Sequence, residues 1–295
     1  MRKVEHKGII EGILSEIDIK EVSYEKNGVP MEALSGVVKV RVNLDNETLE
    51  IPVNVFANKI TNAGKEHPGY KSLQTLKDNF VSIAAGGEEN ADAIRVTGIN
   101  LVMNEYYDQN GNLISYPRVR ASFFNKVKKD ELAPKAEFDL EMMIASVNDD
   151  LDKEGVPTGR LKIMGIVPQY NGVDVMPFYA INDKAVSFIK NYWKEGDTVK
   201  MHGKIHFTSK HEIIKEDVAF GDPIERTRTI TTSELIGTAG TNALEGDFAF
   251  DRAEIDKLLA ERKARLEAEK EKSMSRTKQA SAPAPSGSFG DNLGF

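Results

Sequence analysis

The sequence predicts a mainly β protein that contains two tandem five-stranded barrels, a C-terminal amphipathic helix and a disordered tail. Short runs that alternate apolar and polar residues dominate the first 235 residues, with Gly, Asn and Asp between them. Such alternation is typical of strands with one face in a core. The same order of elements occurs twice, and 295 residues are enough for two cores. After residue 272 the chain becomes rich in Ser, Ala, Pro and Gly, which cannot build a core.

Each copy is predicted to contain a long first strand, a strand pair, a helix and two further strands. In the first copy these are strands 7–19, 35–43 and 48–57, a helix at 70–79, and strands 92–104 and 116–124. In the second copy they are strands 137–148, 159–167 and 173–181, a helix at 184–193, and strands 197–207 and 224–232.

This order is that of the OB-fold, a Greek-key barrel with its helix between the third and fourth strands. Gly98 and Gly203 fall in the two fourth strands, where a small barrel needs a bend or bulge to close. The predicted domains are 1–130 and 131–240, followed by a helical segment at 241–272 and a tail at 273–295. The alternative is a pair of unrelated antiparallel β domains.

The amino-acid composition limits the classes of function that this chain can have. There is no Cys and no apolar run that could span a membrane, so a cytoplasmic protein is expected. The residues offer no nucleophile, metal set or phosphate loop at a persuasive spacing, which predicts a protein without enzymatic activity, metal or cofactor. A formal charge of −7 argues against a uniformly basic nucleic-acid binder. Whether the chain can bind nucleic acid therefore depends on how the charges are distributed over the strand faces.

The outer faces of equivalent strands in both copies carry Lys, Arg and His. Because side chains alternate between the two faces of a strand, cations flanked by inward apolar residues point outward. The cations predicted to face outward are Lys39, Arg41, Arg118, Arg120, Arg160, Lys162, Lys200, His202, Lys204, Arg226 and Arg228. Solvated strand faces often carry such residues for solubility alone, but their repetition in two copies favours a basic groove.

Aromatic residues interleave with these cations. Bases of a single strand stack on exposed aromatic rings while Lys and Arg contact the phosphates. The candidates for stacking are Phe56, Tyr106, Tyr107, Tyr116 and Phe124 in the first copy, and Tyr170 and Phe178 in the second. Tyr106 and Tyr107 lead into DQNGN at 108–112, a hairpin tip that places them on a projecting arm.

The stretch YWKEGDTVKMHGKI at 192–205 supplies a more specific signal. Tyr192, Gly196, Asp197, Val199 and Gly203 fill a pattern found in single-stranded DNA-binding proteins of bacteria and their phages. With the barrel order, the chain resembles that family, most closely a phage-type member with two barrels. The resemblance implies sequence-independent binding and protection of single-stranded DNA during replication or recombination.

In that family a short Phe-ended tip docks replication and repair proteins. Here the matching residues are Phe289, Asp291, Leu293 and Phe295, although the tether before them is not acidic. Residues 251–272 have one apolar helical face that packs on a barrel or pairs with another chain, giving a homo-oligomer. The alternative function is a structural or protein-binding tandem β protein, such as a virion component or an inhibitor of a host factor.

Overall fold

The computed structural model describes residues 4, 6–26, 28–61, 63–216 and 224–280, without the side chains at 210–213, 215–216, 224–229 and 276–280. Its strands are β1 (Lys7–Lys26), β2 (Val29–Asn43), β3 (Thr48–Asn58), β4 (Ala93–Thr97), β5 (Asn100–Tyr107), β6 (Leu113–Arg120), β7 (Phe123–Val127), β8 (Lys135–Leu151), β9 (Pro157–Gln169), β10 (Gly172–Ala180), β11 (Thr198–Glu216) and β12 (Ile224–Gly240). Its helices are α1 (Pro68–Asn79), α2 (Ile83–Gly86), α3 (Asp183–Tyr192) and α4 (Arg252–Ala280), with short 3₁₀ turns at Lys129–Glu131 and Gly246–Phe248.

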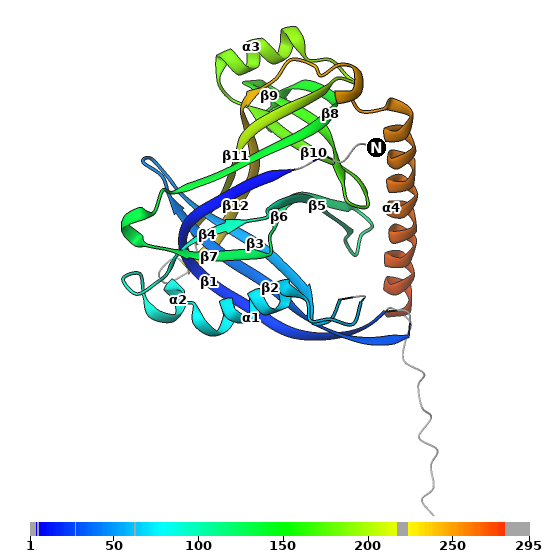
Figure 1. Cartoon of the computed structure of the whole chain (residues 1–295). Coiled ribbons are helices and arrows are strands. Elements are labelled where there is room, and N and C mark those ends of the chain that lie inside the picture. The colour runs from blue at the N-terminus through cyan, green and yellow to red at the C-terminus, as the bar shows by residue number, and fades with distance from the viewer. Residues whose placement is uncertain (1–3, 5, 27, 62, 217–223, 281–295) are drawn as a thin grey trace, which may run out of the picture.

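Strands β8 to β12 form a closed five-stranded barrel, seen in the upper part of Figure 1. Antiparallel pairing runs from β8 to β9 and on to β10, β10 pairs in parallel with β12, and β12 pairs with β11, which returns to β8. Gly203 makes this closure possible. A Cβ there would lie 2.4 Å from both the Ile236 carbonyl oxygen and the Phe138 ring. The register shift at His202/Gly203 is the bulge predicted for this strand.

The first half of the chain repeats this pairing order with interrupted strands. Strands β1, β2 and β3 are antiparallel neighbours, β3 pairs in parallel with β6, and β4 pairs with β1 and β7. The single strand predicted at 92–104 is divided into β4 and β5 by Gly98, whose φ of 64° suits glycine. A Cβ at Gly98 would also lie 2.9 Å from the Phe123 ring. The glycine therefore breaks the strand rather than bending it.

The two halves are joined in one sheet and share one core. Lys7–Glu11 of β1 pair with residues 135–139 of β8, so that the first strands of the two halves lie side by side. Val38 of β2 and Phe178 of β10 are both fully buried in the same hydrophobic cluster. The groove described below is therefore built on a continuous framework.

Helices α1 and α3 occupy equivalent places in the two halves, at the bottom and top of Figure 1. His67 caps α1 by accepting a hydrogen bond from the Gly69 amide at 3.0 Å, and Pro68 stands at its first turn. Asn182 caps α3 by accepting from the Ala185 amide at 2.7 Å. Both helices were predicted from the sequence to within two residues at each end.

Helix α4 stands along one side of the molecule and spans both halves (Figure 1). Near its start, Ile255 is fully buried in a cluster with Ile166 of β9 and Val173 of β10. Farther along, Arg262 forms an ion pair with Glu105 of β5, and Leu266 is buried. Residues 251–272 were expected to pack either on a barrel or against another chain, and in the structure they pack on strands of their own chain. No helix in the described ranges is long and apolar enough to cross a membrane.

The predicted fold class is thus confirmed: the chain is mainly β, with a closed five-stranded barrel and a C-terminal helix. Two hairpins are longer than predicted. Strands β1 and β2 remain paired out to Lys26 and Val29, and β11 and β12 out to Glu216 and Ile224. In the first hairpin, residues 20–26 and 29–32 include no buried side chain, whereas Ala33 and Leu34 are still buried. The predicted tail, apart from the helical residues to Ala280, lies outside the described residues.

Candidate nucleic-acid interface

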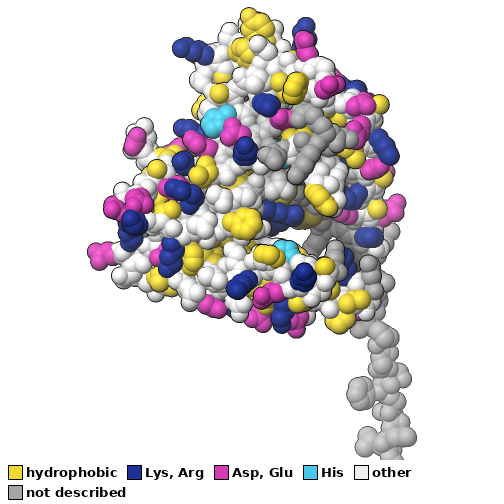
Figure 2. Space-filling model, viewed as in Figure 1, with side chains coloured by type: hydrophobic (Ala, Val, Ile, Leu, Met, Phe, Trp, Pro, Cys, Tyr) yellow, Lys and Arg dark blue, Asp and Glu magenta, His cyan; other side chains and the backbone are white. Residues whose placement is uncertain are grey.

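Four surface hollows follow one another along the first half of the molecule where it meets β11, β12, the β9–β10 turn and α4, and neighbouring hollows share lining residues. The first, of about 850 Å³, is lined by Lys39 and Arg41 and shares Pro52 with the second, of about 520 Å³. The second shares Arg118 with the third, of about 530 Å³, which in turn shares Arg120 with the fourth, of about 380 Å³. We call this run of hollows the β6 groove. Figure 2 shows Lys and Arg side chains inside a hollow near the level of β5 and β6, with apolar side chains around it.

Arg118 and Arg120 lie at the centre of the β6 groove. Val119 between them is fully buried and pairs with Val53 of β3, so the two arginines point to the other face of β6. Arg118 Nη1 donates a hydrogen bond to the Asn104 Oδ1 atom at 2.8 Å. Arg120 is exposed. Among the described residues no carboxylate lies within ion-pair distance of either guanidinium, which leaves both charges available to an anion.

Three aromatic rings project along the same groove. Phe56 of β3 is 54% exposed and Tyr116 of β6 is 38% exposed, although both lie on strands with well-packed inner faces. Tyr170, in the turn between β9 and β10, is 99% exposed. The Arg118 guanidinium carbon lies 6.0 Å from the Tyr116 ring centroid, so a cation and a ring occur together. The groove therefore combines exposed aromatic rings with guanidinium groups that have no carboxylate partner among the described residues.

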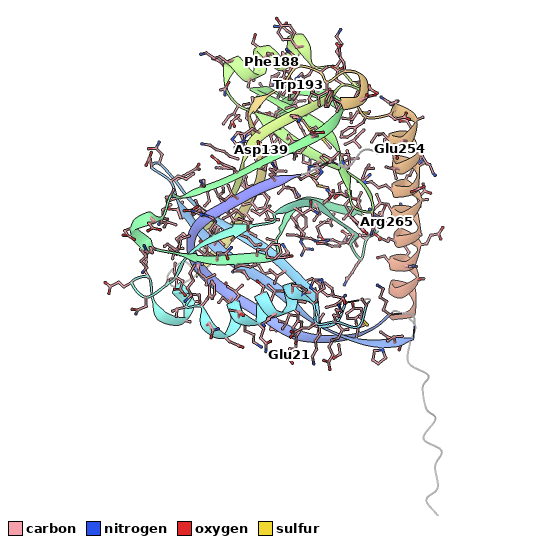
Figure 3. All side chains as sticks on the ribbon, viewed as in Figure 1. Glu21, Asp139, Phe188, Trp193, Glu254 and Arg265 are labelled. Carbon is pink, nitrogen blue, oxygen red and sulfur yellow. The ribbon has the colours of Figure 1, made fainter. Side chains whose placement is uncertain are left out.

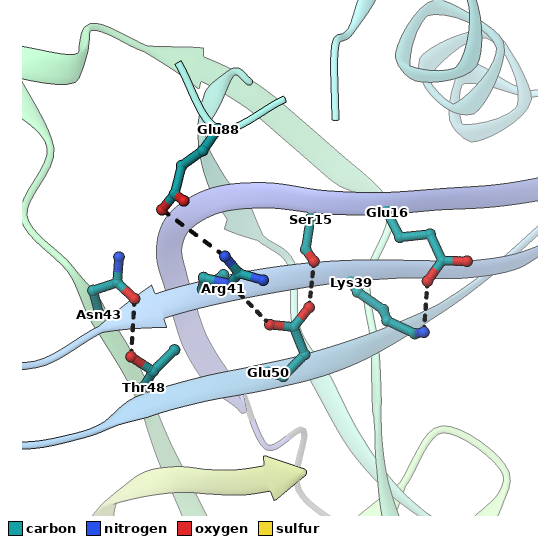
Figure 4. Close-up of polar contacts among 8 residues, drawn as sticks. All are labelled: Ser15, Glu16, Lys39, Arg41, Asn43, Thr48, Glu50 and Glu88. Carbon is teal, nitrogen blue, oxygen red and sulfur yellow. Dashed lines mark hydrogen bonds and ion pairs between the residues drawn. The ribbon is translucent and has the colours of Figure 1, made fainter. Parts of the chain in front are cut away.

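The first hollow of the groove has a different electrostatic character. Lys39 Nζ lies 2.5 Å from the Glu16 carboxylate, and Arg41 lies 3.3 Å from Glu50 and 3.9 Å from Glu88 (Figure 4). The other carboxylate oxygen of Glu50 accepts a hydrogen bond from the Ser15 hydroxyl. The two predicted cations do lie in the groove, but each already has a carboxylate partner.

Most of the predicted cations of the second half are also paired and do not line the β6 groove. Arg160 contacts Asp150 and Glu234, at 3.2 and 2.8 Å. Its guanidinium lies 4.6 Å from the ring centroid of Tyr179, where burial raises the pKa of the phenol. Lys200 and His202 contact Glu141 and Asp139, respectively, at 3.1 and 2.9 Å.

Lys162 of β9 and the exposed Lys204 of β11 have no carboxylate at ion-pair distance in the described part of the chain. Neither residue lines the β6 groove. Arg226 and Arg228 belong to β12, but their side chains lie outside the described residues.

Two of the aromatic predictions, Phe178 and Phe124, require correction. Phe178 is fully buried, with its ring centroid 5.8 Å from that of Phe138, so it packs in the core and no base can reach it. Phe124 is likewise buried. Tyr106 is 47% exposed at the end of β5, whereas the ring of Tyr107 is covered by Lys270 of α4, with 5.8 Å from Nζ to the centroid. The arm that carries these tyrosines is therefore held by α4.

The four tip residues Phe289, Asp291, Leu293 and Phe295 lie outside the described residues. The described residues include no group of three or more His, Cys, Asp or Glu side chains that could hold a metal ion. The sequence analysis missed Asn54 and Asn100, which line the third hollow, and Arg265, which lines the fourth. Strand alternation in TLEIPVNVFA places Asn54 on the same face as Phe56, so that residue was detectable; no pattern in the sequence marked Arg265.

A buried carboxylate lies where the two halves meet. Asp174 of β10 is 8% exposed, and its Oδ2 atom accepts a hydrogen bond from the Met103 amide of β5 at 3.1 Å. Burial raises the pKa of the Asp174 carboxyl, although the Met103 hydrogen bond lowers it. A second link between the same elements is the hydrogen bond from Gln169 Nε2 to the Leu101 carbonyl oxygen at 2.9 Å. These contacts fix the second half against the end of the β6 groove.

Comparisons with known proteins give three findings. Two crystal structures of the single-stranded DNA-binding protein from Thermus aquaticus are similar to this chain, and each aligns over 85% of this chain and 99% of the other. The wild-type protein gives a TM-score of 0.47 at 10% sequence identity, and a deletion mutant gives 0.46 at 11%. No curated protein sequence matches the chain. The profile of the family described as YorF matches residues 5–272, and the chain therefore belongs to the YorF family.

Proposed function

We propose that this protein binds single-stranded DNA without sequence preference and thereby protects it. The observation that supports this function is the β6 groove. Its hollows share Arg118 and Arg120, which have no carboxylate partner among the described residues, and its walls expose Phe56 and Tyr116. In this proposal residues 1–130 and 131–240 act as two units that hold one strand between them in the cytoplasm.

The two kinds of side chain have separate tasks. Phosphates contact Arg118 and Arg120, which gives affinity that falls with salt because binding releases counterions. Bases stack on Phe56 and Tyr116, and stacking tolerates any base because every base has a π-face. Side-chain amides of Asn54 and Asn100 line the same hollow and supply hydrogen bonds that do not depend on one base. Binding without chemistry is the whole mechanism.

This arrangement favours single strands over duplex DNA. In a duplex the base faces are stacked on one another, so Phe56 and Tyr116 would have no surface to contact. A single strand exposes those faces, and each stacked base contributes about 1–3 kcal/mol. Discrimination against duplex therefore comes from the aromatic side chains, whereas the arginines would attract either form.

A second candidate is a structural or protein-binding β protein that does not bind nucleic acid. The observation that favours it is the pairing of Arg160, Lys200 and His202 with carboxylates, which is how solubilising surface cations commonly behave. This alternative does not explain why Arg118 and Arg120, which have no carboxylate partner among the described residues, lie beside exposed rings in the β6 groove.

The test is a titration of a fluorescent oligonucleotide with the full chain at two salt concentrations. We expect tight binding to single strands of mixed sequence, weaker binding at the higher salt concentration, and poor binding to the same sequence as a duplex. Absence of single-strand binding at low salt would contradict the proposed function and favour the second candidate.

We further propose that the tip formed by Phe289, Asp291, Leu293 and Phe295 recruits replication or recombination proteins to the bound strand. The support is the sequence resemblance of this tip and the Ser-, Ala- and Pro-rich sequence that precedes it. Removal of residues 281–295 should leave DNA affinity unchanged and abolish capture of such proteins, with Phe295→Ala as the minimal variant. A loss of DNA affinity on removal would contradict this role.

A further inference from the structure

The fourth hollow of the β6 groove is formed by three separate parts of the chain. Strand β5 and the end of β6 contribute Asn104 and Arg120, the β9–β10 turn contributes Tyr170, and helix α4 contributes Arg265 and Glu269. Figure 3 labels Arg265 on α4 at the level of β5. We call this the three-part hollow. Its volume of about 380 Å³ lies within the range of small-molecule sites in proteins.

The walls of the three-part hollow are fixed by buried contacts. Arg262 of α4 and Glu105 of β5 form an ion pair whose side chains are 17% and 6% exposed, respectively. Leu266, one residue after Arg265, is 8% exposed and anchors that turn of the helix. The Met103 to Asp174 hydrogen bond holds β10 against β5. The side chains that line the hollow are thus carried on a rigid frame, which lowers the entropy cost of binding a ligand.

The charged side chains that line the hollow differ in their exposure. Glu105 is paired with Arg262, and Asp174 is buried and accepts the Met103 amide. The remaining charged groups that line the hollow are the exposed guanidinium groups of Arg120 and Arg265 and the carboxylate of Glu269. The exposed charged side chains of this hollow are thus two arginines on different elements and one glutamate, so a phosphate of a ligand can approach two cations.

Tyr170 adds an aromatic surface to these charges. It is 99% exposed, and no described residue forms a ring contact with it. Its position is set by a tight turn, in which Gly172 has a φ of 104° and Gln169 is hydrogen-bonded to β5. The ring contributes nothing to the core, and both of its faces are open to a stacking partner.

We propose that the three-part hollow binds one nucleotide of the single strand, with the base stacked on Tyr170 and the phosphate held between Arg120 and Arg265. This inference rests on the proposed function and extends it, because it carries the strand past the first half onto helix α4. Asn104, which also lines the hollow, contributes an amide that can contact the base edge. Helix α4 is then part of the DNA interface as well as a support.

The first experiment compares Tyr170→Ala with Tyr192→Ala in the oligonucleotide titration. Tyr192 is the matched control because it is 60% exposed at the end of α3, away from the groove. Tyr170→Ala should weaken binding roughly 5- to 150-fold, the range for loss of one stacked base, and Tyr192→Ala should leave it unchanged. Equal affinities for wild type and Tyr170→Ala would overturn the inference.

The second experiment compares Arg265→Ala with Lys263→Ala. Both side chains are exposed on α4, but only Arg265 lines the hollow. Arg265→Ala should reduce the slope of log affinity against log salt by about 0.7, the value for one phosphate contact on a single strand. An unchanged slope, or an equal reduction in Lys263→Ala, would overturn the phosphate contact.

The Tyr170→Trp variant separates this inference from the proposed function. Trp193 is buried and donates its indole N–H to the Thr241 carbonyl oxygen, so its emission should respond little to a surface ligand. Stacking should quench the emission of the introduced indole. Binding without quenching overturns only the nucleotide site, whereas no binding by the wild-type chain overturns the proposed function and this inference together.

Discussion

Arg118 and Arg120 on β6 and Lys39 and Arg41 on β2 lie along one groove, but they differ in what they contact. The β6 pair has no carboxylate within ion-pair distance among the described residues, whereas both β2 cations are paired, Arg41 through Glu50 and Glu88. A phosphate that approaches β2 must compete with a carboxylate, whereas one that approaches β6 competes only with the neutral Asn104 amide oxygen at Arg118. A cation in a groove is therefore available to a phosphate only when no carboxylate of the protein already pairs with it.

The largest difference between the two pairs should appear when the two cations of each pair are replaced by alanine in turn. Arg118→Ala with Arg120→Ala should cost about 3 kcal/mol of binding free energy, from two charged contacts. It should also lower the salt slope by about 1.4. Lys39→Ala with Arg41→Ala is the matched control and should change affinity less than threefold, by about 0.6 kcal/mol. Equal losses in the two double variants, measured by oligonucleotide titration, would abolish the distinction.

Phe56 and Phe178 test the same idea with one residue type. Phe56→Ala should weaken DNA binding by about 2 kcal/mol through loss of one stacking surface, with little change in thermal stability. Phe178→Ala should instead lower the free energy of unfolding by about 3–5 kcal/mol, because it leaves a cavity beside Phe138. Denaturant unfolding and oligonucleotide titration of both variants separate the two roles. A stability loss as large in Phe56→Ala would place that ring in the core.

Removal of a carboxylate partner should make the β2 pair more like the β6 pair in its affinity for phosphate, with a smaller effect than the two changes above. Glu50→Gln removes the nearer carboxylate from Arg41 and keeps an oxygen that accepts the Ser15 hydroxyl hydrogen bond. Affinity for single-stranded DNA should rise by about 0.5 kcal/mol, the worth of one partly exposed ion pair. Glu154→Gln, in the exposed β8–β9 turn, serves as the charge-matched control. A fall in affinity would show that Glu50 positions Arg41 for the phosphate.

The smallest effect concerns pH and the carboxylate of Asp174. Burial raises the pKa of this carboxyl in the folded state, so stability is lost as pH rises through the folded-state pKa. Asp174→Asn keeps an oxygen for the Met103 amide and removes that loss. The variant should melt at a higher temperature than wild type at neutral pH, with no such gain at pH values below the ordinary carboxyl range. An advantage that is the same at all pH values would exclude ionisation as the cause.

Strand alternation was sufficient for much of the fold and for the centre of the groove. Val119 lies between Arg118 and Arg120 and is the residue of the three that suits the core. Strand alternation therefore placed the side chains of both arginines on the outer face. The pairing of Lys39 depended on register instead. A bulge between Leu14 and Glu16 sets Glu16 opposite Lys39, and no single strand pattern contains that information.

Two further residues show the limits of local patterns. The stretch that contains Phe178 has apolar side chains on both faces, with Val175 on one and Met176 on the other, so its inward face was ambiguous. Arg265 reaches the groove only because α4 crosses from the second half to β5. That placement depends on tertiary contacts such as the Arg262 to Glu105 ion pair, which the helical pattern of α4 does not reveal.

The pairing of β1 with β8 has a consequence for the order of folding. Residues 7–11 lie at the start of the chain, and their partners at 135–139 follow the entire first half. During synthesis this edge of β1 stays open until β8 has emerged, and an open strand edge is a template for pairing with other chains. Long-range pairing of this kind also slows folding, because a long loop closes before it is stabilised. The β1–β8 pairing between the two halves is thus formed late, and a delay in reaching it exposes the nascent chain to aggregation.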